Sequence, residues 1–560
     1  MYVDCYYDRK RDKIHVAERV NGKRILKEDK PEHVLYYSHP GGSHKTIFGD
    51  SCKRFSVYDA KKFSKKKFEL QRDGIKIFES DIRPEFRYLA TKYHGVDAPE
   101  LNVCFFDIEA DFDPDRGFAP TDDPFNAVTA ITFYLSQTKT LFTLALCPPT
   151  LSPSDAQAMC DPKYEEDQLV SGFENTIIFD DESEMLVTFI DMIEDADVLS
   201  GWNSEGYDIP YLINRIKRVV GEKAANNFCL WGQWPRKREY MKFGKAFSTY
   251  DLVGRVHLDY LILYQKHNTQ QQHSYRLDFI GEIEVGENKV PYDGTLDDLY
   301  KKDFYRFVEY NRQDVALLVK IDAKRKFIEL ANQIAHANYV LLKTTVGSVA
   351  LVEQAIINEM HDLGFIVPDR KTELKDDLIE DEDEDEGRTP VVGAYVANPK
   401  QGLRREIGCI DINSLYPSAI RALNMSPETI VGQVRSDETM AFVAKRIADG
   451  TPRAEAWEGL FCTLEVQHMI DQSDDVVTID YEDGRTQSMT GAQLYEYVFN
   501  PVNSVCITAN GTLFRTDKDG IIPQLLAKWY AERKKMQGLS KMFGQLQNGI
   551  EIDEDLAVLL

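Results

Sequence analysis

Long apolar runs are absent from this sequence, which contains no stretch of about 18 apolar residues that could span a membrane. Its opening, MYVDCYYDRKRDK, has no apolar signal region. There is no Walker-type GxxxxGK(S/T) loop, no GxGxxG and no internal repeat, so neither common phosphate-binding loop is expected. These absences predict a soluble, cytoplasmic protein with no membrane partner.

Paired cysteines are also missing, because the nine cysteines are scattered and none forms a CxxC pair. This distribution argues against a zinc site or a disulfide framework. Several cysteines, including Cys104 and Cys409, lie in apolar runs. We expect them to be buried thiols in a reducing compartment.

Positive charge is scarce, with 67 Lys and Arg against 92 Asp and Glu and a net charge of −25. This balance argues against a generic nucleic-acid coat but not against an enzyme that acts on nucleic acid. Residues 376–386, DDLIEDEDEDE, carry nine of the acidic residues. We interpret this run as a solvated linker, with mimicry of a nucleic-acid backbone as a minor alternative.

The 560 residues, 43% of them hydrophobic, suit three or four domains. Residues 1–98 alternate short strand-like runs with a basic patch at 61–68, which is either a solvated face or a contact to a nucleic-acid backbone. Strand-like and helix-like runs alternate over residues 99–330, which predicts an α/β layer. Helical patterns dominate 304–363, and REIGCIDINSLYPSAI predicts a strand that leads into a turn.

Two carboxylates lie two residues apart in FFDIEAD, at Asp107 and Glu109. On a strand these side chains point to the same face, where they repel unless they share a cation or shift their pKa. An isolated DxE more often marks a strand end in solvent. The pair gains weight only from partners elsewhere in the chain.

Two further pieces supply such partners. In GWNSEGYDIPYL, Asn203 and Asp208 lie in a turn before a predicted helix, where an ordinary helix-capping aspartate is the simpler interpretation. In EYNRQDVALL, Tyr310 and Asp314 share one face of a helix, which is common and weak by itself.

Together, these pieces resemble the proofreading 3′–5′ exonuclease of DnaQ-like (RNase H-like) fold found in DNA polymerases. Four carboxylates can hold two divalent ions that activate a water and stabilise the leaving oxygen of a phosphodiester. The resemblance implies two Mg²⁺ or Mn²⁺ ions and the 3′ ends of single-stranded DNA as substrate. The implied ligands and contacts are Asp107, Glu109, Asp208 and Asp314 for the metals, Tyr310 for the water and Asn203 for the substrate.

The segment DINSLYPSAI, residues 411–420, resembles motif A (DxxSLYPS) of family B DNA polymerases. The phrases VPYDG and SPETI, and the GWN turn above, are similar to those of the replicative polymerases of T-even-type phages. The resemblance runs from about residue 99 to the end. A protein encoded by such a phage would be found in the cytoplasm of the bacterial host. It also places Lys289, in NKVPYDG, near the exonuclease metals, although an exposed loop lysine is the plainer interpretation.

The resemblance also implies roles in nucleotide binding. Asp411 binds Mg²⁺ at the polymerase site, and the backbone amides of Ser414 and Leu415 cradle phosphate oxygens of a dNTP. Tyr416 lies under the sugar and excludes a 2′-hydroxyl. Arg533, in AERKKMQ, contacts the triphosphate, because arginine binds phosphate bidentately.

The implied fold is a mixed α/β and α+β multidomain protein. Its expected parts are an N-terminal domain (1–98, returning at 330–372), an exonuclease domain (99–329), an acidic linker (373–387) and the first parts of a palm (388–515) and fingers (516–560).

Two motifs of the family, NSxYG and DTDS, do not occur in the sequence. One aspartate cannot hold two metals for nucleotidyl transfer. We therefore expect the N-terminal subunit of a split phage-type replicative polymerase, in which a C-terminal polymerase chain supplies both motifs, shares the Mg²⁺ and brings any sliding clamp to the primer–template. The alternatives are a truncated polymerase that acts only as a 3′–5′ exonuclease, and a non-catalytic DNA- or RNA-binding regulator.

Overall fold

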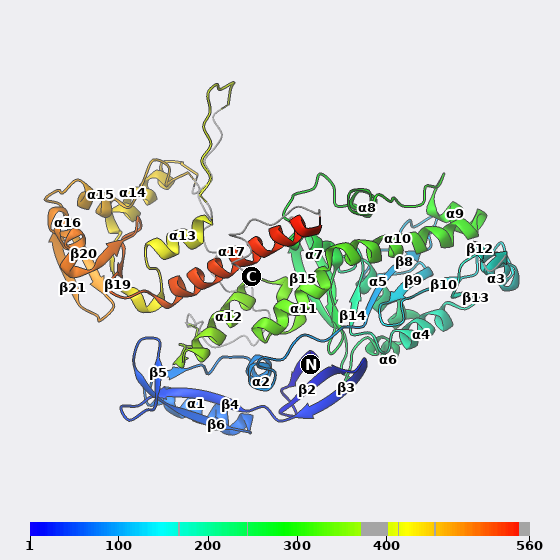
Figure 1. Cartoon of the computed structure of the whole chain (residues 1–560), viewed down its shortest axis with the longest axis horizontal. Helices are drawn as coiled ribbons and strands as arrows, with labels where there is room; N and C mark the ends of the chain where they lie inside the picture. Colours follow the sequence, from blue (N-terminus) through cyan, green and yellow to red (C-terminus); the bar gives the residue numbers. More distant parts are fainter. Residues whose placement is uncertain (166–167, 243–244, 371–400, 413, 453–454, 548–560) are drawn as a thin grey trace. The chain divides into compact units, whose positions relative to one another are not determined.

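The computed structural model describes six stretches of the chain, residues 1–165, 168–242, 245–370, 401–412, 414–452 and 455–547. The chain divides into two compact units, Met1–Arg370 and Lys371–Leu560, which we describe separately (Figure 1). The acidic run at 376–386 lies outside the described residues. None of the described helices is long and apolar enough to cross a membrane.

The first unit begins with a three-stranded antiparallel sheet and a five-stranded mixed sheet. A three-stranded sheet contains β1 (Tyr2–Asp8), β2 (Lys13–Val20) and β3 (Lys23–Asp29). A five-stranded sheet has the order β18-β5-β6-β4-β7, with strands Phe365–Ile366, His44–Thr46, Ser51–Val57, His33–Ser38 and Ile77–Phe78. Its edge strand β18 comes from almost 300 residues further along the chain than β7 and pairs in parallel with β5. Helices α1 (Ala60–Arg72) and α2 (Pro84–Lys92) accompany these sheets.

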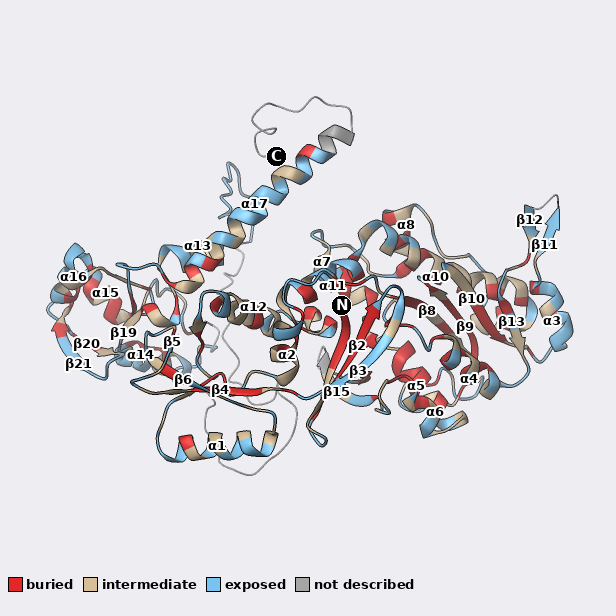
Figure 2. Cartoon of the chain, turned by 60° about the horizontal axis from the view of Figure 1, so that its bottom comes forward, coloured by how far each residue is buried: buried red, intermediate tan, exposed pale blue. Residues whose placement is uncertain are grey.

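A six-stranded mixed sheet forms the centre of the unit, in the order β13-β10-β9-β8-β14-β17. Its strands are Thr176–Phe179, Thr140–Leu146, Val128–Leu135, Val103–Ala110, Val198–Ser200 and Val256–His257. The middle strands β8 and β9 pair antiparallel and are largely buried (Figure 2), as expected for their nearly continuous apolar sequences.

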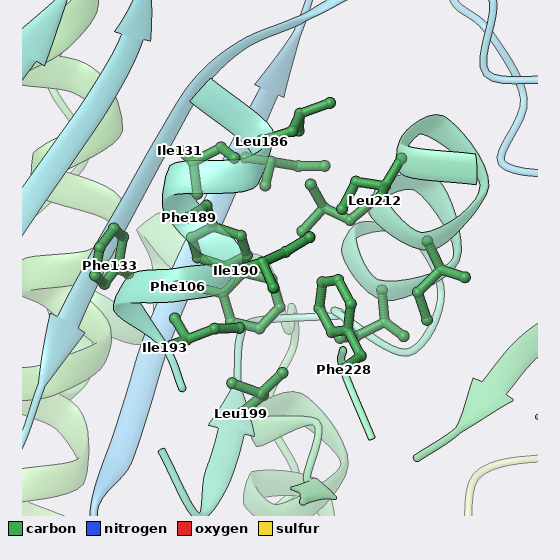
Figure 3. Packing of buried hydrophobic residues seen from close by; sticks show 14 of the residues in the cluster. Phe106, Ile131, Phe133, Leu186, Phe189, Ile190, Ile193, Leu199, Leu212 and Phe228 are labelled. Carbon is green, nitrogen blue, oxygen red and sulfur yellow. The ribbon is translucent and has the colours of Figure 1, made fainter. Parts of the chain in front are cut away.

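Helices cover both faces of this sheet. On one face, Phe106 of β8 packs with Phe189 of α4 (Glu182–Met192) and Leu212 of α5 (Asp208–Val219), as Figure 3 shows. On the other face, Phe105 packs with a cluster from α7, α8, α10 and α11. Those helices span Tyr260–His267, Leu277–Val285, Phe304–Arg325 and Phe327–Asn338. Alternate residues of β8 therefore face different helical layers.

Smaller elements complete the unit. Two hairpins are formed by β11 with β12 (Lys163–Glu165, Gln168–Ser171) and β15 with β16 (Arg236–Lys242, Lys245–Asp251). The remaining helices are α3 (Pro153–Cys160), α6 (Glu222–Asn226), α9 (Leu296–Lys302), η1 (Leu342–Val346) and α12 (Val349–Asp362).

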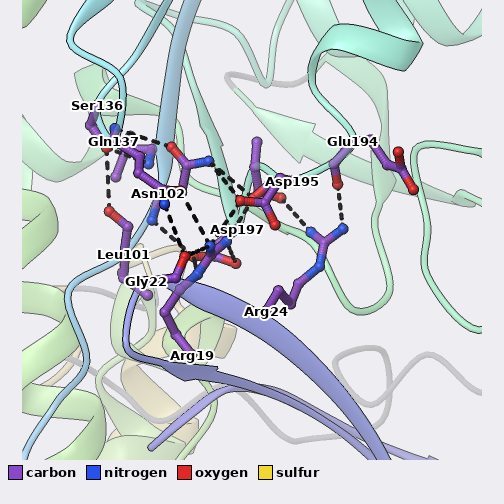
Figure 4. Close-up of polar contacts among 12 residues, drawn as sticks. Arg19, Gly22, Arg24, Leu101, Asn102, Ser136, Gln137, Glu194, Asp195 and Asp197 are labelled. Carbon is purple, nitrogen blue, oxygen red and sulfur yellow. Dashed lines mark hydrogen bonds and ion pairs between the residues drawn. The ribbon is translucent and has the colours of Figure 1, made fainter.

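A buried ion pair joins β2 to the central sheet (Figure 4). Arg19 donates to both carboxylate oxygens of Asp197, at 2.8 and 2.7 Å, and to Asp195 at 2.9 Å. Asp197 lies next to β14, and its side chain is fully buried. Burial raises the pKa of Asp197 in spite of these bonds, so the carboxylate depends on Arg19 for its charge.

The second unit contains a five-stranded antiparallel sheet in the order β21-β20-β19-β23-β22. The strands are Thr486–Thr490, Val476–Tyr481, Ile430–Val434, Thr512–Arg515 and Val505–Ile507. The helices are α13 (Leu415–Ala422), η2 (Pro427–Thr429), α14 (Asp437–Ala448), α15 (Leu464–Ile470), α16 (Gly491–Phe499), η3 (Pro501–Asn503) and α17 (Ile521–Gln547).

Two expectations from the sequence are wrong. Residues 407–412 form no strand, because none of the described strands pairs with them, and their apolar side chains stay exposed, Ile410 at 94%. Cys409 lies in this segment and is exposed rather than buried. Of the other cysteines, Cys104 is buried in the central sheet as expected.

Replacing Arg19 with alanine should destabilise the first unit, because it leaves the buried Asp197 carboxylate without a cation. Removing one partner of a buried pair typically costs about 3–5 kcal/mol. We expect a drop in Tm of several degrees by differential scanning calorimetry. Arg54→Ala is the matched control, since Arg54 and Glu32 pair at 2.8 Å with side chains 38% and 29% exposed. An equal drop in Tm for the two variants would contradict the claim that the buried Arg19–Asp197 pair stabilises the first unit more than an exposed pair does.

Candidate active site

Strand β8 presents two carboxylates to one helical layer. Val103 and Phe105 pack into the cluster that includes α10, and Asp107 and Glu109 follow them at the same spacing of two. Ile108 points to the opposite cluster. Asp107 and Glu109 therefore lie on the α10 side of the sheet, each half-buried.

Helix α10 completes a cluster of acidic groups. Carboxylate oxygens of Asp107, Glu109 and Asp314 lie within 4.8 Å of one another. Asn311, one turn earlier on the same helix face, donates its amide N–H to Asp107 Oδ2 at 2.9 Å. The expected strand pair and the expected helical aspartate thus meet in one place.

Asp208, on helix α5, contacts the same strand. It is the first residue of α5 and is only 4% exposed. Its Oδ1 accepts a hydrogen bond from the backbone N–H of Ile108 at 3.3 Å. Ile108 is the residue between Asp107 and Glu109, so this bond holds the Asp208 carboxylate next to β8. The fourth expected carboxylate therefore also belongs to this site.

These carboxylates are electrostatically unfavourable without a cation. Burial raises the pKa of Asp107 well above its usual range, and Asp208, Glu109 and Asp314 add to the effect. Burial and the neighbouring Asp314 raise the pKa of Glu109 to about 8. Burial raises the pKa of Asp208 to about 7, although the Ile108 N–H opposes it. Burial also raises the pKa of Asp314.

Lys289 supplies one positive charge at the edge of the cluster. Its Nζ forms an ion pair with Asp314 and donates to the Tyr310 hydroxyl at 3.2 Å. Burial lowers the pKa of Lys289, but Asp314 and Asp107 outweigh it and the net shift is upward. The side chain is 31% exposed, so Lys289 lies between the acidic cluster and solvent.

The cluster suits divalent metal ions. Its ligands are carboxylate oxygens, which Mg²⁺ and Mn²⁺ prefer. Asp314 Oδ1 is buried and has no hydrogen-bond partner among the described residues, so it is available as a ligand. Asp107, Glu109, Asp208 and Asp314 are the residues that would hold the ions.

Two positioning residues escaped the sequence analysis. Asn311 is one; its position three residues before Asp314 could have indicated it. The other is Asp259, which is 4% exposed and accepts backbone N–H bonds from Asn203 at 3.1 Å and Glu205 at 3.0 Å. Asn203 adopts a left-handed φ of 65°, so Asp259 holds the turn that precedes Asp208 in an unusual conformation. No local pattern announces Asp259, because it lies about 50 residues further along the chain.

The second predicted set lies in the other unit. Asp411 is exposed, and the described residues contain no second acidic cluster around it that could hold a metal ion. Ser414 has a left-handed φ of 53° and precedes α13, which begins at Leu415. Leu415 and Tyr416 are 52% and 65% exposed.

Helix α17, which carries Arg533, is anchored near α13. The Arg421 guanidinium of α13 lies 5.9 Å from the ring centre of Tyr530 on α17, and Arg533 follows Tyr530 by one turn. At the start of α17, the backbone N–H groups of Gly520 and Ile521 donate to Asn424 at 2.7 Å and Glu428 at 2.6 Å. The acceptors Asn424 and Glu428 belong to the segment NMSPET, which follows DINSLYPSAI. That segment therefore fixes where α17 begins.

Neutralising Asp107 should stabilise the metal-free protein. A folded-state carboxyl pKa above the unfolded value means that stability is present at low pH and is lost as the pH rises through the folded pKa. For Glu109 this window runs from its ordinary value to about 8. In EDTA near pH 8, Asp107→Asn should therefore raise Tm by about 2–4 °C per kcal/mol of relieved repulsion.

Saturating Mn²⁺ should remove or reverse this difference, because the unmodified site binds the ions more tightly. Asp191→Asn, at an exposed position of α4, is the control and should leave Tm unchanged. A lower Tm for Asp107→Asn in EDTA would contradict the repulsion argument.

Comparisons with known proteins match both parts of the chain to one family. The family model described as "DNA polymerase family B, exonuclease domain" matches residues 50–280, which include Asp107, Glu109 and Asp208. The model described as "DNA polymerase family B" matches residues 340–543, which include Asp411, Tyr416 and Arg533.

Individual relatives extend the match over most of the chain. It is 25% identical over 533 residues to the DNA-directed DNA polymerase of Escherichia phage RB69, covering 91% of this chain and 50% of that protein. It is 31% identical over 268 residues to that of Enterobacteria phage T4, covering 48% and 28%. The DNA polymerase of Paramecium bursaria Chlorella virus NY2A is 26% identical over 387 residues, covering 64% and 38%. The chain thus spans about half the length or less of these relatives. By both family models and by its similarity to the phage enzymes, the chain belongs to DNA polymerase family B.

Proposed function

We propose that this protein removes nucleotides from the 3′ ends of DNA as a proofreading exonuclease. The observation that carries the proposal is the convergence of Asp107, Glu109 and Asp314, with oxygens within 4.8 Å, at a site that Asp208 also reaches. The match to a family B exonuclease domain supports it. The phage relatives are DNA-directed DNA polymerases, which supports DNA as the substrate.

In the proposed reaction, water attacks the terminal phosphorus and the P–O3′ bond breaks. The terminal nucleotide leaves as a 5′-monophosphate, and the new DNA end keeps the oxygen and takes a proton. Two bound Mg²⁺ or Mn²⁺ ions would supply an activated water and stabilise the leaving oxygen.

The protein's own groups orient this chemistry. Burial raises the pKa of Tyr310, so its hydroxyl keeps its proton. Because that hydroxyl accepts from Lys289 Nζ, its O–H can donate to the attacking water. Lys289 also offers positive charge to a phosphate at the rim of the site. Asn203, whose backbone N–H donates to Asp259, would contact the substrate.

We also propose that the second unit contributes to DNA synthesis on a primer–template. Asp411 would bind Mg²⁺, the Ser414 and Leu415 amides and Arg533 would contact the dNTP phosphates, and Tyr416 would select deoxyribose. The match to the family B polymerase model over these residues supports the assignment.

The NSxYG and DTDS motifs, which supply the remaining groups in the family, do not occur in these 560 residues. We propose that a second polypeptide provides them, shares the metal and recruits any sliding clamp. A polymerase that uses only its exonuclease, or a regulator that binds nucleic acid without catalysis, is the outcome if no second polypeptide restores synthesis. We also propose the domain limits expected from the sequence: an N-terminal domain at 1–98 and 330–372, an exonuclease domain at 99–329, a linker at 373–387, and the first parts of a palm at 388–515 and of fingers at 516–560.

Asp107→Ala should abolish degradation of a 5′-labelled single-stranded oligonucleotide in Mg²⁺. If the bound metals no longer stabilise the transition state by several kcal/mol, the rate of cleavage falls by about 10³-fold or more. Asp113→Ala is a matched control on the following loop, where Asp113 only accepts backbone N–H bonds from Asp115 and Arg116. It should keep full activity. Activity retained in Asp107→Ala would show that the metal site lies elsewhere.

Asp411→Ala should separate the two activities. The variant should degrade single-stranded DNA at the normal rate, because Asp411 lies outside the exonuclease cluster. Combined with a polypeptide that carries the NSxYG and DTDS motifs, it should fail to extend a primer under conditions where the unmodified chain succeeds. Primer extension on a gel measures both. An unchanged rate of synthesis would refute the role of Asp411.

A further inference from the structure

A pocket of about 380 Å³ opens beside the start of helix α10, and none of its lining residues belongs to the acidic cluster. Figure 1 shows α3, α9 and β12 around this end of α10. The Thr150 hydroxyl donates to the Lys301 carbonyl at 2.9 Å, and the Gly172 N–H donates to the Tyr305 hydroxyl at 3.3 Å. These bonds join separate segments into one frame, and the volume suits a small organic molecule.

Three lysines line this pocket. Lys163 is exposed and has no carboxylate partner in the part of the chain that the structure describes. Lys301 and Lys302 form ion pairs with Asp297 and Asp298, one turn earlier on α9. An ammonium group has three N–H donors, so the paired lysines keep donors for a ligand. This concentration of lysines on a chain of net charge −25 favours an anionic ligand.

The remaining wall of the pocket is largely apolar. It contains Leu151, Met159 and the rings of Phe304 and Tyr305. Phe304 is buried, whereas Tyr305 is half-buried and stacks on Phe173, with ring centres 4.7 Å apart and planes 27° apart. This stacking holds the Tyr305 ring in place. A ligand that fills the pocket therefore needs an apolar or aromatic body beside its negative charge.

Asp303 adds a hydrogen-bond acceptor to the lining. It is the N-cap of α10, where its Oδ1 accepts from the backbone N–H of Arg306 at 3.2 Å. A carboxylate repels a simple anion, but it accepts hydrogen bonds from amino and hydroxyl groups. The lining therefore suits an anion that also carries such donors, which neither inorganic phosphate with its charge alone nor a fatty acid provides beside an aromatic ring.

We propose that this pocket binds a nucleoside monophosphate, separately from the exonuclease cluster. The lysines would hold the phosphate, the apolar wall and Tyr305 would contact the base, and Asp303 would accept from an amino or hydroxyl group. Such a ligand would contact the helix that presents Tyr310 and Asp314, because Tyr305 and Asp314 lie about 13 Å apart along α10. The proposal goes beyond the exonuclease function and does not depend on it.

Isothermal titration calorimetry of the full chain with 2′-deoxyadenosine 5′-monophosphate (dAMP) in EDTA tests the pocket. EDTA keeps metal ions out of the exonuclease cluster, so dAMP finds no cation there, and the assay measures no cleavage. Failure of this proposal and failure of the exonuclease proposal are therefore distinguishable. We expect about one dAMP per chain with a Kd below about 1 mM. Deoxyadenosine and inorganic phosphate should each bind at least about 10-fold more weakly, because each lacks half of the contacts.

Two lysine variants locate the ligand. Lys163→Gln and Lys302→Gln should each weaken dAMP binding about 10-fold, the effect of losing one charged hydrogen bond. Both side chains are exposed, so both variants should fold. Lys320→Gln is the matched control for Lys302→Gln, because Lys320 is also exposed and also pairs with a carboxylate, that of Glu287, but lies outside the pocket. It should bind dAMP like the unmodified chain.

Asp107→Asn separates the pocket from the exonuclease cluster and should retain dAMP binding. Loss of binding in this variant would place the ligand at the cluster and overturn the proposal. Unchanged affinity in both pocket lysine variants would do the same, as would no binding of dAMP at about 1 mM. Equal affinity for inorganic phosphate and dAMP would overturn the assignment of a nucleotide as the ligand.

Discussion

Mutual repulsion among four carboxylates, two of them buried and two half-buried, is the constraint around which the first unit is organised. Asp107 and Glu109 share one face of β8, Asp314 meets them from α10, and Asp208 lies at the start of α5. Each of these elements is held by a large apolar cluster on one face of the central sheet. Packing of the two layers therefore offsets the cost of holding like charges together.

A buried carboxylate elsewhere in the unit, Asp197, is fully paired, which the acidic cluster is not. Arg19 satisfies both oxygens of the fully buried Asp197, so that pair needs nothing from outside the protein. At the acidic cluster one lysine, Lys289, faces four carboxylates, and Asp314 Oδ1 lacks a partner among the described residues. The remaining charge is neutralised by protons, as the raised pKa values allow, or by bound cations, as the proposed two-metal site requires. Burial, and after it the charge of neighbouring carboxylates, raises the pKa values of these carboxyl groups.

Much of this site could be predicted from local sequence. The period of two along β8 puts Asp107 and Glu109 on one face, and the helical period does the same for Tyr310 and Asp314. Asn311 and Asp259 could not be singled out in this way, because their roles depend on tertiary contacts across about 200 and 50 residues. The strand expected at 407–412 failed for a related reason. An apolar run becomes a strand only when a neighbour satisfies its backbone, and none of the described strands does so.

Counting bound Mn²⁺ tests the central claim most directly, because it asks whether the carboxylate cluster is a two-metal site without relying on turnover. Titration of the full chain with Mn²⁺ near pH 8, followed by electron paramagnetic resonance of the free ion, gives the number of ions bound. The account predicts about two ions per chain at this cluster, with at least one lost in Asp314→Asn. Binding that is absent, or that Asp314→Asn leaves unchanged, would contradict the assignment of the site.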